Sequence, residues 1–191
     1  MLLQTKYIKG EITLENIKIF ACPTAEEFAQ KVCNHLGLPL GRMECFKFKN
    51  DNTFVKVTES VRGQEVYVIQ TTVPPVNERI MELLITIETL KRAGPSKITA
   101  VLPYYMYSRS DKKDQPRVPI TAKLFASMLE VAGAHSVITC DLHNSSIQGF
   151  FDINVDHLKA KNILIEYFKA KGLDDVVVVA PDEGSVKRAC R

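Results

Sequence analysis

Two hydrophobic periods alternate along the chain. Short apolar runs, typical of buried strands, are separated by longer segments whose apolar residues recur every three or four positions, as on one face of a helix. The predicted strands cover residues 17–20, 66–70, 98–102, 136–140 and 176–180. The predicted helices cover residues 24–37, 75–94, 119–132 and 158–171. This alternation predicts an α/β fold, with a mostly parallel sheet and helices on both of its faces.

Capping residues mark where two of the predicted helices begin and end. Thr24, with Glu27 three residues later, forms the capping-box pattern of a helix start. Pro75 opens the longest predicted helix, and Gly94 closes it. These signals place the helix boundaries and leave the alternation of strand and helix unchanged.

One predicted element departs from this alternation. Residues 45–49 and 53–58 alternate apolar and polar positions on either side of Asn50-Asp51-Asn52, which is a turn sequence. They predict a β-hairpin that projects Phe48 and the two asparagines at its tip. The alternative for Phe48 is an ordinary core aromatic.

Composition excludes several classes of protein. The 191 residues are 46% hydrophobic and 25% charged, as in ordinary globular proteins, and the net charge of +3 is too small to indicate a nucleic-acid partner. The five cysteines include no CxxC pair, which argues for reduced thiols rather than a disulfide framework or a zinc site. No apolar run approaches the roughly 20 residues of a membrane span, and the first ten residues do not resemble a signal peptide. We expect a cytoplasmic protein.

The strongest chemical signal lies between the strand at 98–102 and the helix that begins at Pro119. Residues 103–119, which we call the basic loop, carry four Lys or Arg and two Asp within nine positions. Such a segment buries no core face, so it should be a mobile polar loop. Arginine binds phosphate through a planar fork, and lysine neutralises phosphoryl oxygens. The pattern favours a loop that closes over a polyanion, with a solvated charged loop as the alternative.

Carboxylates and an imidazole follow two other predicted strands. Asp141 and His143 come directly after residues 136–140, and Asp182 follows residues 176–180. In open α/β sheets ligands collect at the carboxyl ends of strands, so these groups and the basic loop are expected to converge on one site. The alternatives are a structural histidine and an aspartate that caps a helix.

Several motifs follow one another along the chain: Ser60-Val61-Arg62-Gly63, Asn77 through Met81-Glu82-Leu83, the loop from Tyr107 to Asp114, Asp141-Leu142-His143, and Ile147-Gln148-Gly149-Phe150-Phe151. Together they resemble the amino-terminal half of ribose-phosphate pyrophosphokinase, over nearly all of residues 17–191. The resemblance implies a phosphoribosyltransferase-like domain. It also implies the family's reaction, in which diphosphate passes from Mg-ATP to ribose 5-phosphate to give phosphoribosyl pyrophosphate and AMP.

The resemblance assigns roles to individual residues. It implies catalytic roles for Arg109, Lys112 and Lys113, which would neutralise charge during the transfer. It implies ATP contacts for Phe48, Asn50, Asn52, Arg109, Ser110, Asp114 and His143. His143 and Asp182 occupy the positions that approach Mg²⁺, and Asp182 is the better direct ligand because Mg²⁺ prefers oxygen.

The resemblance also implies that ATP is bound between subunits of a homo-oligomer. In the family the hairpin tip comes from a neighbouring subunit, so Phe48 would stack on adenine in a shared active site. The amides of Asn50 and Asn52 would read the edge of the base. Asn52 stands where the family generally has Glu, which leaves the strength of that contact and the range of nucleotide donors open.

Ser60, Arg62 and Gln148 match a regulatory phosphate site of those family members that phosphate activates and ADP inhibits. Arg62 is the residue of the three with intrinsic specificity for phosphate. The alternative is that Arg62-Gly63 simply forms the turn between two strands.

The chain stops inside a predicted helix, and the acidic loop by which the family holds ribose 5-phosphate does not occur in the sequence. We therefore expect residues 1–170 to form the amino-terminal domain and residues 171–191 to begin a truncated second one. The enzyme assignment then belongs to the parent protein, and we expect the isolated chain to be inactive. The alternative is a non-catalytic regulatory or oligomerisation subunit, against which the intact basic loop argues.

Overall fold

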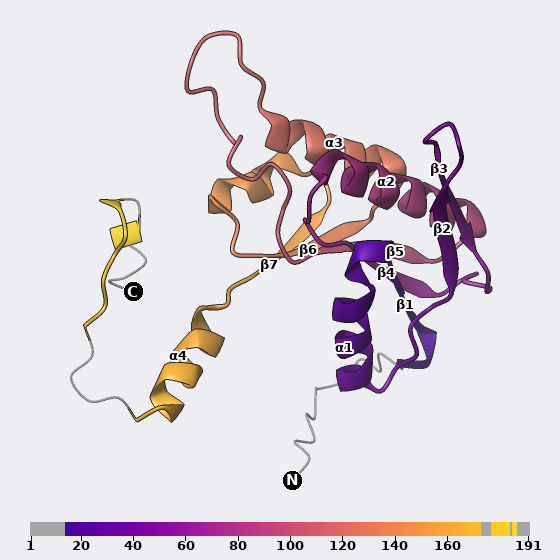
Figure 1. Ribbon diagram of the computed structural model, residues 1–191, viewed down its shortest axis with the longest axis horizontal. Helices are drawn as coiled ribbons and strands as arrows, with labels where there is room; N and C mark the ends of the chain where they lie inside the picture. Colours follow the sequence, from indigo (N-terminus) through magenta and orange to yellow (C-terminus); the bar gives the residue numbers. More distant parts are fainter. Residues whose placement is uncertain (1–13, 173–176, 184, 187–191) are drawn as a thin grey trace. The chain divides into compact units, whose positions relative to one another are not determined.

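The computed structural model describes residues 14–172, 177–183 and 185–186. They belong to two compact units, Met1–Leu158 and Lys159–Arg191. The first unit contains a five-stranded sheet in the order β1-β4-β5-β6-β7, in which all neighbouring strands are parallel, and a separate antiparallel hairpin of β2 and β3 (Figure 1).

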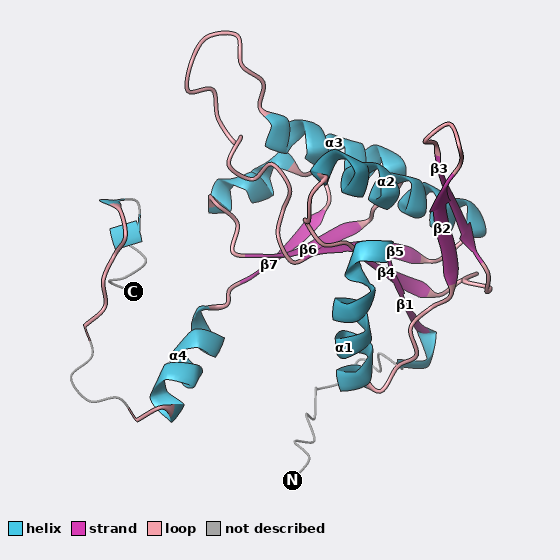
Figure 2. Cartoon of the chain, viewed as in Figure 1, coloured by secondary structure: helices cyan, strands magenta, loops and turns pink. Residues whose placement is uncertain are grey.

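Figure 2 distinguishes the helices from the strands. The strands are β1 Ile17–Ala21, β2 Met43–Lys47, β3 Thr53–Val57, β4 Glu65–Ile69, β5 Lys97–Leu102, β6 Ser136–Cys140 and β7 Asn154–Leu158. The helices are α1 Glu26–Leu36, α2 Val76–Ala93, α3 Thr121–Ala132 and, in the second unit, α4 Lys161–Ala170. Short 3-10 helices are η1 Leu14–Asn16, η2 Pro23–Ala25 and η3 Ser145–Phe150.

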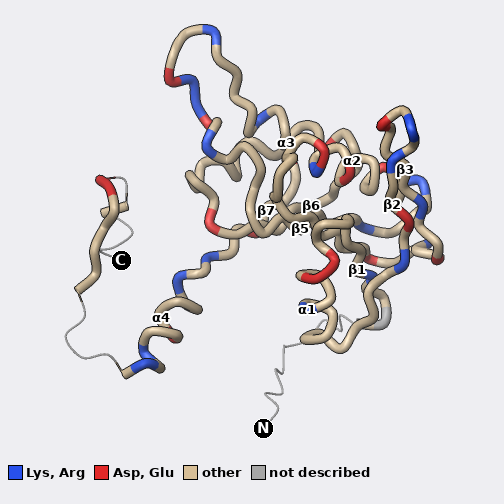
Figure 3. The backbone as a smooth tube through the Cα atoms, viewed as in Figure 1, with Lys and Arg blue, Asp and Glu red and all other residues tan. Residues whose placement is uncertain are grey.

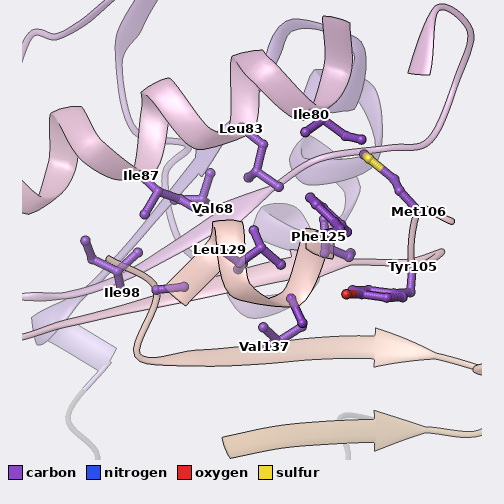
Figure 4. Packing of buried hydrophobic residues seen from close by; sticks show 14 of the residues in the cluster. Val68, Ile80, Leu83, Ile87, Ile98, Tyr105, Met106, Phe125, Leu129 and Val137 are labelled. Carbon is purple, nitrogen blue, oxygen red and sulfur yellow. The ribbon is translucent and has the colours of Figure 1, made fainter. Parts of the chain in front are cut away.

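The main core lies between the sheet and the helices α2 and α3. Leu83 and Ile87 of α2 and Leu129 of α3 have no exposed surface, and they share one cluster with Val68 of β4 and Val137 of β6 (Figure 4). Burying one such side chain stabilises the fold by roughly 1.5–3 kcal/mol. This packing fixes both helices on one face of the sheet.

Helix α1 lies against the opposite face through small residues. Ala29 and Cys33 are fully buried and pack with Ile19 and Ile69 of the sheet. The helix ends at Gly37, which takes the left-handed conformation with φ 69° that glycine adopts at low cost. The predicted α/β fold, a mostly parallel sheet with helices on both faces and a projecting hairpin, is confirmed.

The outer side of β1 is covered by the segment that follows α1. Leu40 forms a parallel bridge with Ile19, and the Gly41 amide donates a hydrogen bond of 2.7 Å to the Ile19 carbonyl. A Cβ atom at Gly41 would lie 2.9 Å from that carbonyl oxygen and 2.6 Å from the Phe20 ring. Only glycine therefore allows the backbone to approach β1 this closely.

Strand β7 was not predicted from the sequence. Three of its five residues, Asn154, Asp156 and His157, are polar, and none of the five is buried. The strand pairs in parallel with β6, and no described residue pairs with its other side. An apolar run is the usual signal of a strand, and a partly exposed outer strand does not need one.

Two local predictions were wrong. Thr24 does not cap α1, because its hydroxyl donates to the Gln70 side chain at 3.0 Å and the helix has Ala25 at its N-cap without a side-chain bond. The predicted strand at 176–180 is not formed by residues 177–180, and Val177 and Val179 are each 79% exposed. A strand requires a paired neighbour, and the described residues supply none there. Residue 176 lies outside the described residues.

The remaining elements agree with prediction to within about three residues at their ends. In the second unit, α4 forms within the predicted helix at 158–171 and has no buried residue. In the part of the chain that the structure describes, no helix is both long and apolar enough to cross a membrane.

Candidate active site

Three neighbouring strands bring the candidate residues to one side of the sheet. β4, β5 and β6 run parallel in adjacent positions, with Leu102 paired to Thr139 near their carboxyl ends. The basic loop therefore leaves the sheet beside the segment that begins with Asp141. This convergence is the geometry by which open α/β sheets build ligand sites.

The root of the basic loop is part of the core. Tyr105, Met106 and Ser108 are buried, and the Tyr105 ring contacts the rings of Phe125 and Phe151 at centroid distances of 5.2 and 5.6 Å. The Tyr105 hydroxyl donates a hydrogen bond of 2.8 Å to the carbonyl of Ala122 at the start of α3. Burial raises the pKa of Tyr105, so the hydroxyl remains a donor at every physiological pH. The loop is thus held firmly where it leaves β5.

Tight turns continue from this root to Ser110. Tyr107 has a positive φ of 58°, which costs of order 1 kcal/mol for a residue with a side chain. Its hydroxyl donates to Asn77 at the start of α2, with an oxygen–oxygen distance of 2.6 Å. The Ser110 amide donates to the Tyr107 carbonyl at 2.8 Å, and the Ser110 carbonyl accepts from Ala122 at 3.1 Å. Arg109 therefore lies between Tyr107 and Ser110, which are both held by hydrogen bonds.

The middle of the basic loop extends away from the sheet, and Lys and Arg residues occur along it (Figure 3). Arg109, Lys112, Lys113 and Asp114 are exposed. Among the described residues, no carboxylate lies close enough to Arg109, Lys112 or Lys113 to form an ion pair. Their charges are therefore not neutralised within the described part of the chain, and an anionic ligand would find them available.

The segment after β6 presents a carboxylate and an imidazole. Asp141 takes a positive φ of 41°, and its amide donates to the Leu158 carbonyl at 3.0 Å. Leu142 is buried, and its amide donates to Nε2 of His157 at 3.0 Å. The side chains of Asp141 and His143 are exposed on either side of this anchored residue.

Asp141 offers a carboxylate oxygen, which is the kind of ligand that Mg²⁺ prefers, and His143 offers an imidazole. Within the described ranges there is no cluster of three or more His, Cys, Asp or Glu side chains that would enclose a metal ion. Mg²⁺ keeps several waters and usually takes one or two carboxylates and substrate phosphates as further ligands. Asp182 belongs to the second unit, where its carboxylate accepts a hydrogen bond of 2.8 Å from the Ser185 amide. Its role with His143 remains a prediction.

The hairpin tip is closed by its own backbone. The Phe48 amide donates to the Asn52 carbonyl, and the Asp51 amide donates to the Phe48 carbonyl, both at 2.9 Å. The Asn50 side chain accepts from the Asn52 amide at 3.3 Å, and Asp51 has φ 66°. This arrangement holds Phe48, Asn50 and Asn52 on one exposed turn.

Phe48 is not a core residue, because its side chain is 49% exposed. Phe46 and Phe54 of the hairpin contact it edge to face, at centroid distances of 5.3 and 5.5 Å. Edge contacts of this kind orient a ring without covering both of its faces. The alternative of an ordinary core aromatic is therefore rejected, and the ring is available for stacking.

The three residues of the predicted phosphate site lie at different ends of the sheet. Ser60 and Arg62 precede β4 and so lie at the amino ends of the strands, while Gln148 follows β6 at the carboxyl ends. All three are exposed, and Arg62 lies in a turn. A single copy of the chain does not bring them together, so a site made of all three would need residues from two copies.

Sequence reasoning did not single out Lys47 or Glu78, which the structure places beside the candidate site. Lys47 ends β2, and its ammonium lies 2.9 Å from a carboxylate oxygen of Glu78 in α2. The available signal was a run of polar residues, Asn77-Glu78-Arg79, at the start of a helix that follows a strand's carboxyl end. Such a run is ordinary in a first helical turn, and its partners come from distant parts of the sequence.

Comparison with known proteins identifies close relatives. Residues 17–133 match the family model described as the N-terminal domain of ribose phosphate pyrophosphokinase. The ribose-phosphate pyrophosphokinase of Fusobacterium nucleatum is 48% identical over 180 residues, covering 93% of this chain and 57% of that protein. The Bacillus subtilis protein of the same name is 49% identical over 175 residues, covering 92% and 55%.

A solved structure agrees with these matches. The crystal structure of phosphoribosylpyrophosphate synthetase from Mycobacterium smegmatis superimposes with a TM-score of 0.88 at 42% identity, covering 91% of this chain and 59% of that one. The chain therefore spans little more than half the length of the curated relatives that it matches.

Proposed function

The chain belongs to the ribose-phosphate pyrophosphokinase family, and from this premise we propose that it forms the ATP-binding side of an enzyme that makes phosphoribosyl pyrophosphate. In this reaction diphosphate passes from Mg-ATP to the 1-hydroxyl of ribose 5-phosphate, and AMP is released. The observation that carries the proposal is the basic loop, whose root is buried while Arg109, Lys112 and Lys113 have no ion-pair partner among the described residues.

The loop residues would act by positioning and charge neutralisation. Transfer of a phosphoryl-type group develops charge on the phosphate oxygens, and fixed cations stabilise that charge. Arg109 and Ser110 would hold the nucleotide near the sheet, since both lie in the anchored part of the loop. Lys112 and Lys113 would reach the diphosphate from the exposed part, with Asp114 nearby.

Mg²⁺ would be held by the triphosphate together with His143 and Asp182, and when bound it neutralises phosphate charge. Asp182 would be the direct ligand and His143 would act through a bound water, because Mg²⁺ binds oxygen in preference to nitrogen. The exposed position of His143 at the carboxyl ends of the strands supports this arrangement.

The adenine would be bound between two copies of the chain. The exposed ring of Phe48 offers a stacking surface, and Asn50 and Asn52 offer amides on the same turn. In this arrangement the hairpin tip of one copy completes the site of another, and the assembly is a homo-oligomer in the cytoplasm.

Ribose 5-phosphate would be bound by a second domain that begins at residues 171–191. This chain covers 57% and 55% of the lengths of the two relatives named above. We accordingly expect the 191-residue chain to be inactive alone. The competing proposal, a non-catalytic regulatory or oligomerisation subunit, is disfavoured by the complete set of cations in the basic loop.

The test is formation of AMP and phosphoribosyl pyrophosphate from Mg-ATP and ribose 5-phosphate. The longest polypeptide that contains this sequence should be active, and the 191-residue chain should not. Arg109→Ala or Lys112→Ala should lower turnover at least about 100-fold, the effect of removing one preorganised charge-stabilising group. The matched control is Arg117→Gln, which removes an exposed charge from the same loop and should leave turnover near normal. Full activity in either alanine variant, or an inactive long polypeptide, would contradict the proposal.

A further inference from the structure

Three consecutive residues in the first turn of α2 each bind a different part of the molecule. Asn77 accepts the hydrogen bond of Tyr107 from the basic loop, at 2.6 Å. Glu78 lies 2.9 Å from the ammonium of Lys47 at the end of β2. Arg79 forms a pair with Glu82 one turn further along the helix. We call residues 77–79 the α2 platform.

On the hairpin side, the ammonium group of Lys47 connects the α2 platform to the hairpin tip. Lys47 contacts Glu78 and Asp51, and both nitrogen–oxygen distances are 2.9 Å. Asp51 is the residue of the tip with a positive φ. Lys47 donates hydrogen bonds to the carboxylates of Glu78 and Asp51. Both bonds raise the pKa of Lys47, and the bond to Glu78 has the larger effect. This bridge through Lys47 therefore ties the turn that carries Phe48 to the first turn of α2.

The α2 platform itself is anchored to the end of β4 by a largely buried polar network. Arg79 Nη1 donates to both carboxylate oxygens of Glu82, at 2.6 and 2.7 Å. Gln70 donates to Glu82 at 3.2 Å and to the Arg79 carbonyl at 3.1 Å. The Gln70 side-chain oxygen accepts from the Thr24 hydroxyl and the Thr71 amide. Arg79 Nη2 also lies 3.6 Å from Glu78, which joins this anchor to the bridge.

The loop side of the α2 platform is the bond between Tyr107 and Asn77. Tyr107 stands two residues before Arg109 and holds the Ser110 amide through its carbonyl. Its positive φ must be stabilised by contacts around it. The bond to Asn77 is one such contact, so the position of Arg109 depends on α2 as well as on the loop's own turns.

We propose that Asn77 and Glu78 are positioning residues through which the α2 platform couples the basic loop to the hairpin tip. The inference rests on the proposed function for its ligand, a nucleoside triphosphate. If a hairpin tip completes the site of another copy, then the α2 platform links the site in one copy to the site in the next. A displacement of Tyr107 would then be transmitted to Phe48 through two residues that are neighbours in one helical turn.

The first experiment needs no ligand. Backbone hydrogen exchange of the 191-residue chain is compared for wild type, Glu78→Gln and Tyr107→Phe. Glu78→Gln should speed exchange of the Phe48 and Asp51 amides by about twofold to fivefold, the range for a partly exposed ion pair. Tyr107→Phe should speed exchange of the Ser110 amide by about twofold to tenfold, the range for one lost hydrogen bond.

Coupling is measured in the segment that the substituted residue does not contact directly. Tyr107→Phe should also speed exchange at the hairpin tip, and Glu78→Gln should also speed it at Ser110. The matched control is Glu88→Gln, which breaks the exposed pair of Glu88 with Arg92 on the same helix and should change neither segment. If each variant affects its own segment alone, the coupling is absent and the proposal is overturned.

The second experiment uses the active long polypeptide and separates positioning from support of the fold. Glu78→Gln and Asn77→Ala should raise KM for Mg-ATP about twofold to tenfold while the melting temperature and the KM for ribose 5-phosphate stay near wild type. Lys47→Arg keeps the charge and should retain a normal KM, whereas Lys47→Met should not. If wild type shows no Mg-ATP-dependent reaction, the proposed function fails, and the exchange experiment still decides the coupling. An unchanged KM for Mg-ATP in both platform variants would overturn their positioning role.

Discussion

Replacing Glu82 with glutamine removes one charge from the network beneath α2. The carboxylate accepts two hydrogen bonds from Arg79 and one from Gln70. The side chains of Arg79 and Glu82 are only 13% and 7% exposed. Glutamine has nearly the same volume, and its carbonyl still accepts from Gln70. The guanidinium of Arg79, however, loses its main partner and stays largely buried.

The size of the effect follows from this burial. Breaking a buried ion pair by removing one partner costs about 3–5 kcal/mol, because an uncompensated charge remains. Arg79 keeps a weaker contact with Glu78 at 3.6 Å, so a loss of roughly 3 kcal/mol is expected here. In a chain of this size each kcal/mol shifts the melting temperature by about 2–4 °C, which gives a fall of about 6–12 °C.

Urea unfolding followed by circular dichroism measures the loss directly. Glu88→Gln is the control on the same helix, because its pair with Arg92 is exposed and its removal should cost less than about 0.5 kcal/mol. A double variant, Arg79→Met with Glu82→Leu, leaves no buried charge and should recover most of the stability. A loss below about 1 kcal/mol in Glu82→Gln, or a double variant no more stable than the single one, would refute this account of the network.

Three further predictions concern single side chains. Phe48→Ala should weaken ATP binding by about 1–3 kcal/mol in calorimetry, and mixing it with Arg109→Ala protein should restore some activity if sites are shared between copies. Cys22 should resist alkylation at pH 8 until the chain unfolds, because burial raises the pKa of its thiol to about 12. For Glu59, burial acts to raise the pKa, but hydrogen bonds from Lys18 and the Arg42 amide lower it overall. Its stabilising contribution should therefore be present above the usual carboxylate pKa and lost as the pH falls through the lowered value, and acid titration of Glu59→Gln should lack that loss.

Four strands of the sheet, β1, β4, β5 and β6, were predictable because their signals are local. Most residues of Val66–Gln70 and Ile98–Leu102 are buried, and a central parallel strand of that kind is mostly apolar. The exposed part of the basic loop was predictable for the opposite reason, since its charges exclude it from any core. Its buried root was not predicted. Tyr105 packs on Phe125, whereas the hydroxyl of Tyr107 donates to Asn77, and sequence spacing reveals neither contact.

The local predictions that failed involve competition between distant partners. Thr24 has the capping-box pattern, yet its hydroxyl donates to Gln70, which is brought near by the pairing of β1 with β4. The contact of Lys47 with Glu78 likewise depends on how the hairpin packs on α2. Neither partner is visible in a window of neighbouring residues, so local patterns predicted the elements and missed the bonds between them.

The two outer strands of the sheet also bear on solubility. An unpaired strand flank can add a strand from another molecule, which is a common route to aggregation. The flank of β1 is occupied by Leu40 and Gly41, and β7 carries exposed Asn154 and Asp156 where an apolar strand would invite a partner. Substituting a larger residue for Gly41 would expose the β1 backbone as well as crowd Phe20. Neither flank therefore invites continuation of the sheet from one molecule into the next.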